Sequence, residues 1–150
     1  MKDMLKDPMI VRQMIMDHYQ YPRNHQLLDK GEFLEKHMDS ESCIDDIKVQ
    51  MVVKDNIIKD IRFDGIACTI STASTSIMTE LLMDKTLEQA QLIINEYNKM
   101  INDVDYDEDL LESAIVFSNV NKQANRINCA TIGWEAAEFL IEKSSDDNVK

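Results

Sequence analysis

The sequence predicts a single α+β domain, in which a small antiparallel sheet of about three strands packs against five or so α-helices. Apolar residues alternate with polar ones from 47 to 63, and from 70 onward they recur three to four positions apart. The chain of 150 residues has only 3 glycines and 2 prolines, so few positions break regular structure. No repeat or linker divides the chain, and we expect residues 1–150 to form one domain with a loose tail at about 144–150.

The first elements follow from these spacings. A helix is expected over 9–19, where apolar residues recur at helical spacing, and 21–24 is expected to form a turn. Alternation then predicts a strand over 47–53 and a second strand over 57–63. The intervening residues 54–56 suit a tight turn, so the two strands should form an antiparallel hairpin.

The second half of the chain is expected to be helical. Apolar spacing predicts helices over 70–81 and 87–101, although the first of these contains a run of serine and threonine. After an acidic loop at 102–109, a shorter helix is expected over roughly 110–119. The last helix is expected to begin near Cys129 and to bury Ile132, Ala136, Phe139 and Leu140.

The composition excludes several classes of protein. With 16 basic and 28 acidic residues the formal net charge is −12, which argues against a nucleic-acid partner because such binding needs clustered Lys and Arg. No apolar run approaches the ~20 residues that cross a bilayer, so no membrane association is expected. The segment 1–7 lacks the apolar core of a secretory signal, and a cytoplasmic location is therefore expected.

The three cysteines, Cys43, Cys68 and Cys129, are the most informative residues. An odd and small number does not suit a disulfide framework, which leaves buried bystanders, catalytic thiols or metal ligands. Cys43 precedes the hairpin and Cys68 follows it, so both should lie at the same end of the sheet. Cys68 and Cys129 are expected at the starts of helices, where backbone N–H groups favour a thiolate. This placement favours one converging site.

A carboxylate can complete the ligand set. Residues i and i+2 of an extended segment project to the same side, so Cys43 and Asp45 can face one point, whereas Asp46 faces the other way. Three thiolates and a carboxylate suit tetrahedral Zn²⁺, and an iron–sulfur cluster is the alternative because thiolates also bind iron. Spacing alone is a weak signal, since the cysteines form no compact metal motif.

Four segments, taken in order, resemble the IscU/NifU-like family of iron–sulfur cluster assembly proteins over nearly the whole chain. Residues 16–24 resemble the D-H-Y-x-x-P-R-N segment of that family, and Cys43-Ile44-Asp45 lies where the family has C-G-D. Residues 63–71 resemble F-x-G-x-G/A-C-x-I-S, and residues 126–134 resemble R-x-x-C-A-x-L-x-W. The resemblance implies an IscU/SufE-like fold.

Within this family the chain is more similar to the SufU branch than to the IscU scaffolds. A scaffold typically has histidine before its third cysteine, where this chain has Asn128, and it carries a Pro-Pro motif, whereas this chain has no proline after Pro22. The long stretch between Cys68 and Cys129 resembles the insertion of the SufU branch. This resemblance implies a zinc-dependent sulfurtransferase, which takes persulfide sulfur from a SufS-type cysteine desulfurase and passes it toward a downstream iron–sulfur scaffold.

The resemblance also assigns roles to residues. It implies a zinc site made of Cys43, Asp45, Cys68 and Cys129. Cys43 would be the sulfur acceptor, and Arg126 would hold the anionic site or the migrating sulfur. One departure is Ile44, which replaces the glycine of the family motif and cannot supply the backbone freedom that glycine would.

Two other interpretations stay open. The same four residues could bind a transient [2Fe–2S] cluster, as in a scaffold, or the zinc could be structural in a non-catalytic adaptor. The histidines His18, His25 and His37 lie outside the matched cysteine segments. We therefore expect them to be packed or solvated rather than to bind metal.

Overall fold

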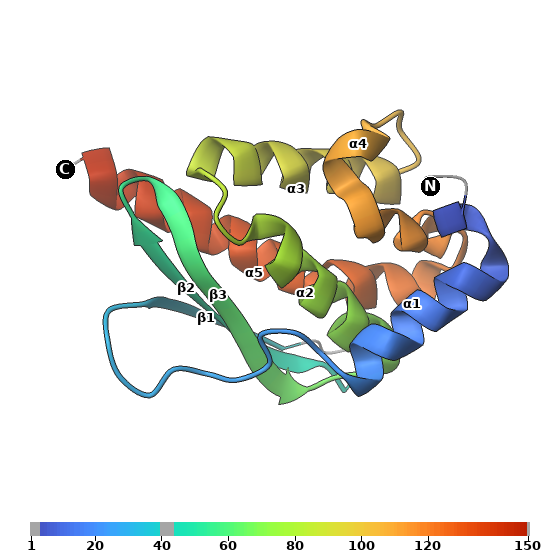
Figure 1. Ribbon diagram of the computed structural model, residues 1–150, viewed down its shortest axis with the longest axis horizontal. Helices are drawn as coiled ribbons and strands as arrows, with labels where there is room; N and C mark the ends of the chain where they lie inside the picture. The colour runs from blue at the N-terminus through green and yellow to red at the C-terminus, as the bar shows by residue number, and fades with distance from the viewer. Residues whose placement is uncertain (1–3, 40–43, 150) are drawn as a thin grey trace.

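In the computed structural model, the described residues, 4–39 and 44–149 with side chains as far as Ser145, form five α-helices and three β-strands (Figure 1). The strands are β1 (Leu34–Asp39), β2 (Asp46–Lys54) and β3 (Ile57–Ile66). The helices are α1 (Pro8–Gln20), α2 (Thr69–Leu82), α3 (Leu87–Ile101), α4 (Glu108–Leu111) and α5 (Ala124–Val149). Short 3₁₀ helices span Met4–Lys6, Glu112–Phe117 and Val120–Lys122.

The strands form an antiparallel sheet in the order β1-β2-β3, with β2 in the centre. In this register Asp46, at the start of β2, lies opposite Asp39 of β1 and Ile66 of β3. Helix α5 packs against β1 and β2, and α2 packs against β3 and α5 (Figure 1). A small antiparallel sheet covered by helices confirms the predicted α+β class.

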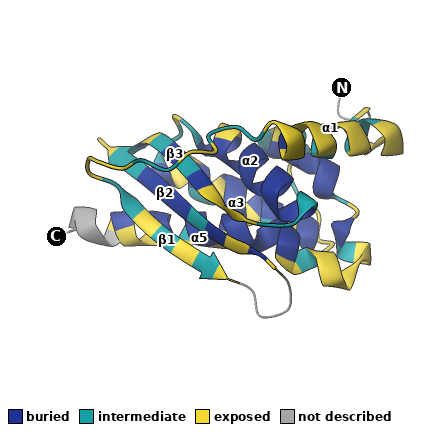
Figure 2. Ribbon diagram, turned by 90° about the horizontal axis from the view of Figure 1, so that it is seen from below, coloured by how far each residue is buried: buried dark blue, intermediate teal, exposed yellow. Residues whose placement is uncertain are grey.

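Helix α2 lies in the centre of the molecule, and 12 of its 14 residues are buried (Figure 2). Its many serine and threonine side chains are small, which allows α1 and α5 to pack closely against it. The sheet contributes the other side of the core through Ile47, Val49, Met51, Ile61 and Phe63. The apolar spacing that predicts this helix is therefore confirmed, despite the polar composition of the segment.

Strand β1 completes the predicted sheet of about three strands, and its position is not evident from the sequence. Its burial alternates, with Leu34, Lys36 and Met38 less exposed than their neighbours. Lys36 lies between Leu34 and Met38 among the inward-facing residues, so the segment lacks the apolar alternation that would predict a strand. The Lys36 ammonium lies 4.4 Å from the ring centroid of Phe139, which remains 44% exposed. The expectation that Phe139 is buried is therefore wrong, because its ring supports a cation at the edge of the sheet.

Helix α5 begins at Ala124 rather than near Cys129, so the predicted start of this helix is wrong. The residues 124–128 are exposed or half-buried on every side. Such a turn carries no apolar periodicity, and the pattern emerges only where α5 enters the core.

The end of α5 and the segment before it also differ from expectation. The backbone is helical as far as Val149, where a loose tail was expected from 144 onward, because no glycine or proline interrupts this part of the chain. The helix expected over 110–119 is instead the single turn α4 followed by a 3₁₀ helix. The two meet at Glu112, whose φ of 45° ends the α-helical geometry.

Candidate metal centre

Three of the predicted ligands come together at one end of the sheet. One ligand atom each from Asp45, Cys68 and Cys129 lies within 4.8 Å of the others. They come from three different places in the fold: the residue before β2, the residue before α2, and the second turn of α5. Asp45 is only 1% exposed and Cys129 is 7% exposed, while Cys68 is half-buried. The cluster is therefore open to solvent mainly on the side of Cys68.

The hairpin brings Asp45 and Cys68 to the same end of the sheet, whereas Cys43, for which this end was predicted together with Cys68, lies outside the described residues. Strand β3 ends at Ile66, opposite Asp46, and the backbone N–H of Cys68 then donates to Asp45 Oδ1 at 2.8 Å. Gly65 permits this close approach, because its φ is +141° and a Cβ there would lie 2.0 Å from the carbonyl oxygen of Asp46. A side chain at position 65 would force the two strand ends apart.

Cys68 occupies the N-cap position of α2, which confirms its predicted place at a helix start. Its Sγ accepts a hydrogen bond from the N–H of Ser71 at 3.4 Å, in the manner of an N-cap side chain. The Ser71 hydroxyl lies 3.4 Å from the same sulfur and donates to Asp45 Oδ2. Ser71 is a residue that sequence reasoning missed, although its place three positions after an N-cap cysteine was a usable signal.

Cys129 lies inside α5 and not at its start, so the prediction that a helix start favours its thiolate is wrong. Burial raises the pKa of the Cys129 thiol, and the nearby sulfur of Cys68 and carboxyl of Asp45 raise it further. A thiolate at this position therefore needs a nearby positive charge. A divalent cation held by the three groups would supply it.

A buried hydrogen-bond network fixes the turn of α5 that carries Cys129. The carbonyl oxygen of Ala130 accepts hydrogen bonds from Ser74 Oγ and from the Tyr97 hydroxyl, both at 2.7 Å. Trp134 Nε1 donates to Ser74 Oγ at 3.0 Å, and its ring stacks on Tyr97 with centroids 3.8 Å apart. Trp134 is 1% exposed and anchors this turn of α5 in the core.

The two predicted catalytic residues stand differently in the structure. Cys43 lies outside the described residues, so its sulfur is not placed relative to the other three ligands. Arg126 is exposed in the first turn of α5, three residues before Cys129 and hence near the same side of the helix. Ile44 is 68% exposed, so the side chain that replaces the family glycine projects into solvent and leaves the ligand cluster unobstructed.

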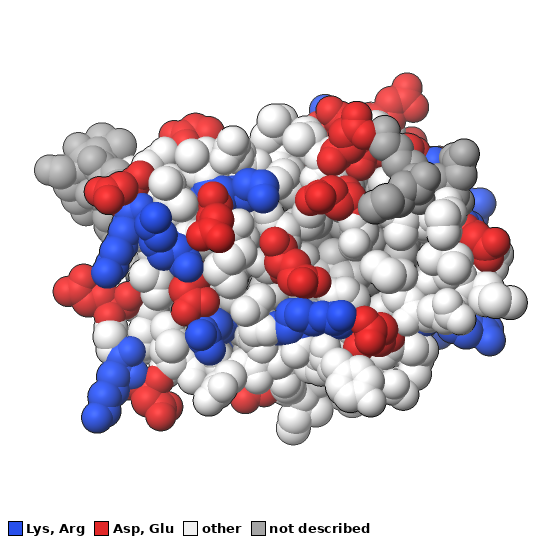
Figure 3. Space-filling model, viewed as in Figure 1, with Lys and Arg blue, Asp and Glu red and all other residues white. Residues whose placement is uncertain are grey.

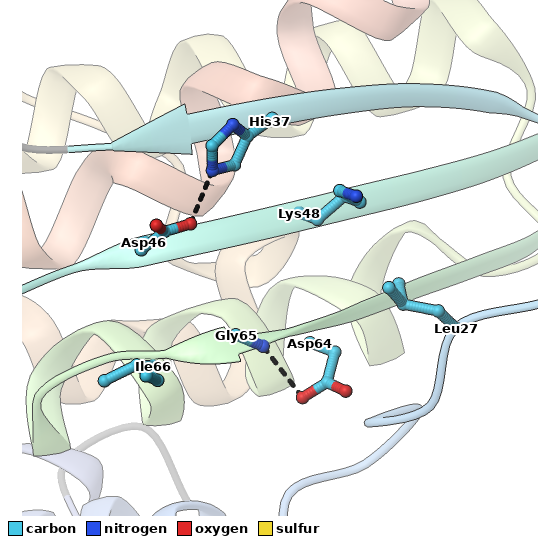
Figure 4. A pocket seen from close by; sticks show the side chains of 7 residues that line it. All are labelled: Leu27, His37, Asp46, Lys48, Asp64, Gly65 and Ile66. Carbon is cyan, nitrogen blue, oxygen red and sulfur yellow. Dashed lines mark hydrogen bonds and ion pairs between the residues drawn. The ribbon is translucent and has the colours of Figure 1, made fainter.

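Asp46 faces away from the cluster, as the two-residue period of an extended chain predicts. It lies on the outer face of the sheet and pairs with His37 Nε2 (Figure 4). Both side chains line a hollow of about 470 Å³ together with Lys48, Asp64 and Ile66. This hollow contains no group of three metal-ligating side chains, since the described residues hold such a group only at Asp45, Cys68 and Cys129.

The other histidines are also engaged elsewhere. His18 is 3% exposed, and its Nδ1 lies 2.8 Å from Ser76 Oγ at the interface of α1 and α2. His25 is exposed, and its Nε2 lies 3.1 Å from Asp64 Oδ1. His18 is therefore packed and His25 is largely solvated, as expected.

The donor set fits a zinc ion. A carboxylate and two sulfurs within 4.8 Å of one another are ligands that Zn²⁺ accepts in a tetrahedral arrangement, and one position remains for a fourth ligand. A divalent cation bound here would offset the burial of the Asp45 carboxylate and would favour the thiolate form of Cys129, whose pKa is raised. Iron also accepts these ligands, so the geometry alone does not select the metal.

Comparison with known families decides where the chain belongs. Residues 10–146 match the family described as NifU-like N terminal domain. The chain belongs to this family. The resemblance of its four segments to IscU/NifU-like proteins is thereby confirmed.

Relatives within the NifU-like family include proteins of both branches. The chain is 34% identical over 140 residues to the zinc-dependent sulfurtransferase SufU of Bacillus subtilis (strain 168), which covers 93% of this chain and 94% of that protein. It is 32% identical over 143 residues to the iron–sulfur cluster assembly scaffold protein IscU of Streptococcus pyogenes serotype M1, with coverages of 91% and 89%.

Solved structures share the fold. The crystal structure of a SufU from Fervidobacterium islandicum AW-1, described as a putative iron–sulfur cluster assembly scaffold protein for the SUF system, matches with a TM-score of 0.78 and 26% identity, covering 86% of this chain and 94% of that one. The N-terminal part of a NifU-like protein from Brucella abortus matches with a TM-score of 0.80, covering 89% of this chain and 93% of that one. At 16% identity this second likeness concerns the fold alone.

The surface agrees with the charge composition. Acidic and basic side chains are interspersed on the face shown in Figure 3, where no extended basic patch forms. Within the described residues, no helix combines the length and the apolar character needed to cross a bilayer.

Proposed function

We propose that the chain is a zinc-dependent sulfurtransferase of iron–sulfur cluster assembly, with Cys43, Asp45, Cys68 and Cys129 as the zinc ligands and Cys43 as the sulfur acceptor. The observation that carries the proposal is the convergence of Asp45, Cys68 and Cys129 within 4.8 Å. Cys43 precedes Asp45 by two positions in the sequence, in the segment that resembles the C-G-D motif of the family. The similarity to the sulfurtransferase SufU over nearly the full length supports the same activity.

The transfer is a thiol–persulfide exchange. The Cys43 thiolate attacks the outer sulfur of a persulfide on the donor protein, so that a new S–S bond forms to Cys43 as the donor's S–S bond breaks. The donor cysteine leaves as a thiolate and Cys43 becomes a persulfide, so no external oxidant or reductant is needed. A bound Zn²⁺ would keep its thiol ligands deprotonated near neutral pH and has no redox chemistry of its own.

Two exposed residues that lie close to candidate ligands in the sequence, Arg126 and Ile44, suit this exchange. Arg126 is exposed, and its guanidinium can donate hydrogen bonds to an anionic persulfide sulfur. Ile44 follows Cys43 and is 68% exposed, so a donor protein that reaches Cys43 also meets this apolar side chain. We propose that the donor is a SufS-type cysteine desulfurase, that the acceptor is a downstream iron–sulfur scaffold, and that both meet the chain in the cytoplasm.

A second candidate function is a scaffold that binds a transient [2Fe–2S] cluster at the same residues. The observation that favours it is the 32% identity to a protein described as the scaffold IscU over most of both chains. Against it stand Asn128, where scaffolds typically carry a histidine beside the third cysteine, and the lack of any proline after Pro22. A protein that purifies without zinc but reconstitutes a stable brown cluster would favour this candidate.

The experiment that tests the first candidate follows sulfur itself. The desulfurase is charged with ³⁵S-cysteine and mixed with the wild-type chain or with Cys43→Ser, and labelled protein is separated without reducing agent. We expect label on the wild type and none on Cys43→Ser. Arg126→Ala is expected to bind zinc and to accept label more slowly, which separates a role in transfer from a role in metal binding. Label on Cys43→Ser equal to that on the wild type would sink the proposal.

A further inference from the structure

Ser71 contacts two of the candidate ligands although the sulfur transfer does not use it. The side chain is 0% exposed. Its hydroxyl donates to Asp45 Oδ2 and lies 3.4 Å from Cys68 Sγ, and its backbone N–H donates to the same sulfur at 3.4 Å. One residue in the first turn of α2 therefore bridges the carboxylate that precedes β2 and the sulfur that caps α2.

These bonds fix the orientation of the Asp45 carboxylate. Oδ1 accepts from the N–H of Cys68 at 2.8 Å and Oδ2 accepts from the Ser71 hydroxyl. A donor on each of the two carboxylate oxygens fixes the plane of the group. Without the hydroxyl, Oδ2 of this buried carboxylate loses a donor, and the group is held less firmly about its χ2 angle.

We propose that Ser71 is a positioning residue, which keeps Asp45 and Cys68 directed at a common point so that the site binds Zn²⁺ tightly. This inference rests on the proposed zinc site. The hydroxyl holds the carboxylate in place before the metal arrives, so little ordering remains when Zn²⁺ binds. Outer-shell hydrogen bonds of this kind orient metal ligands in general, and losing one typically weakens metal binding about 10–100-fold.

A matched control exists on the same helix. Ser76 is also 0% exposed, and its hydroxyl is also hydrogen-bonded, to the backbone N–H of Arg23 and to His18 Nδ1, each at 2.8 Å. These partners belong to α1 and to the turn after it, and none of them is a candidate ligand. Removal of either hydroxyl costs a buried hydrogen bond, but only Ser71 supports the ligands.

The experiment measures the Zn²⁺ affinity of the purified full chain by competition with a chromophoric zinc chelator. For Ser71→Ala we expect the dissociation constant to rise about 10–100-fold. For Ser76→Ala we expect it to stay within about threefold of the wild type while the melting temperature of the metal-free protein falls. Ser71→Thr keeps the hydroxyl, and it should retain most of the affinity that Ser71→Ala loses.

Two further measurements make the result specific. The absorption spectrum of the Co²⁺-substituted protein reports the ligand geometry directly, and it should change in Ser71→Ala but not in Ser76→Ala. If Ser71→Ala is partly unfolded, the rise of its melting temperature with added Zn²⁺ still gives the affinity. Equal zinc affinities for the wild type and Ser71→Ala, with unchanged cobalt spectra, overturn the inference and leave the proposed zinc site intact. A wild type that binds no Zn²⁺ overturns both.

Discussion

At the residue scale, two adjacent aspartates illustrate how a one-residue shift along an extended chain separates two roles. Asp45 is 1% exposed and accepts hydrogen bonds from the N–H of Cys68 and the hydroxyl of Ser71. Asp46 is exposed on the outer face of the sheet, where it pairs with His37. Their side chains have the same chemistry, so comparing them isolates the effect of position.

Substitutions of Asp45 and Asp46 should therefore differ in their effects on zinc content and stability. Asp45→Ala removes a candidate ligand and leaves two buried donors without their acceptor, so we expect loss of zinc and a destabilisation of about 1–3 kcal/mol. Asp46→Ala removes only an exposed ion pair, which contributes about 0–1 kcal/mol, and zinc content should not change. Metal analysis and urea unfolding check both variants. Equal zinc contents in the two variants would remove Asp45 from the ligand set.

His18 makes a prediction about pH. Burial lowers its pKa from 6.5 to about 4, so the folded protein holds it neutral while the unfolded chain binds a proton below pH 6.5. A lowered histidine pKa stabilises the fold above pH 6.5, and this contribution is lost as the pH falls from 6.5 to about 4. The loss amounts to about 3 kcal/mol.

The measurement compares the wild type with His18→Gln, which is neutral at every pH. The difference in unfolding free energy between the two should shift by about 3 kcal/mol in favour of the variant between pH 7 and 4. A difference that stays constant over this range would show that His18 titrates normally.

At the scale of elements, the contact between α2 and α5 determines where Cys129 lies. Gly133 of α5 faces Thr75 of α2, and a Cβ at position 133 would lie 2.3 Å from Thr75 Oγ1 and 2.9 Å from its Cγ2. The two helices approach this closely because position 133 has no side chain. The same pair of helices carries Ser74 and Ala130, whose hydrogen bond is 2.7 Å long.

This packing predicts that Gly133→Ala destabilises the fold by about 1–3 kcal/mol, even though alanine favours helix more than glycine does. Thr75→Ala in the same chain removes the atoms that clash, so the double variant should be less destabilised than the sum of the single ones. Chemical denaturation of the four proteins measures the coupling. If the free-energy changes of the two single variants add up to that of the double variant, the close approach of Gly133 and Thr75 is contradicted.

Several elements could be predicted from the sequence because their signals are local. The hairpin of β2 and β3 alternates in polarity, and α2 keeps its apolar spacing within a run of serine and threonine. Strand β1 has Lys36 among its inward-facing residues, and its position becomes evident only once Phe139 of α5 is placed beside it. The first turn of α5 has no buried face, so its sequence carries no apolar spacing that would place the start of the helix before Cys129.

The candidate site was likewise predictable in part. Asp45 and Cys68 follow from the geometry of a hairpin, which returns to the end where it began. The environment of Cys129 does not follow from local sequence, because its burial depends on how α5 packs on α2. The hydrogen bond between Ser71 and Asp45 does not follow from local sequence either, since the two residues lie 26 positions apart.

At the scale of the whole molecule, the candidate metal centre joins three parts of the fold. The candidate ligands precede β2, cap α2 and lie inside α5, so a bound ion would connect the sheet to the two central helices. An ion that binds only the folded state stabilises it, by about 2.7 kcal/mol when free Zn²⁺ is 100 times the dissociation constant. For a chain of this size that corresponds to a rise of roughly 5–10 °C in the melting temperature.

Thermal unfolding with zinc and with a chelator measures this rise. The wild type and Asp46→Ala should show it, whereas Cys129→Ala should show little of it because one ligand is gone. Equal melting temperatures of the wild type with zinc and with chelator would mean that the cluster does not bind the ion in the folded state.

We propose that a single zinc site presents Cys43 as the sulfur acceptor. The most direct test combines metal analysis with a desulfurase activation assay on the wild type and Cys43→Ser, using Asp46→Ala as the control. We expect about one zinc per wild-type chain. We also expect faster cysteine-dependent sulfide release by the desulfurase with the wild type and with Asp46→Ala, and no acceleration with Cys43→Ser. A zinc-free wild type, or full acceleration by Cys43→Ser, would contradict this proposal.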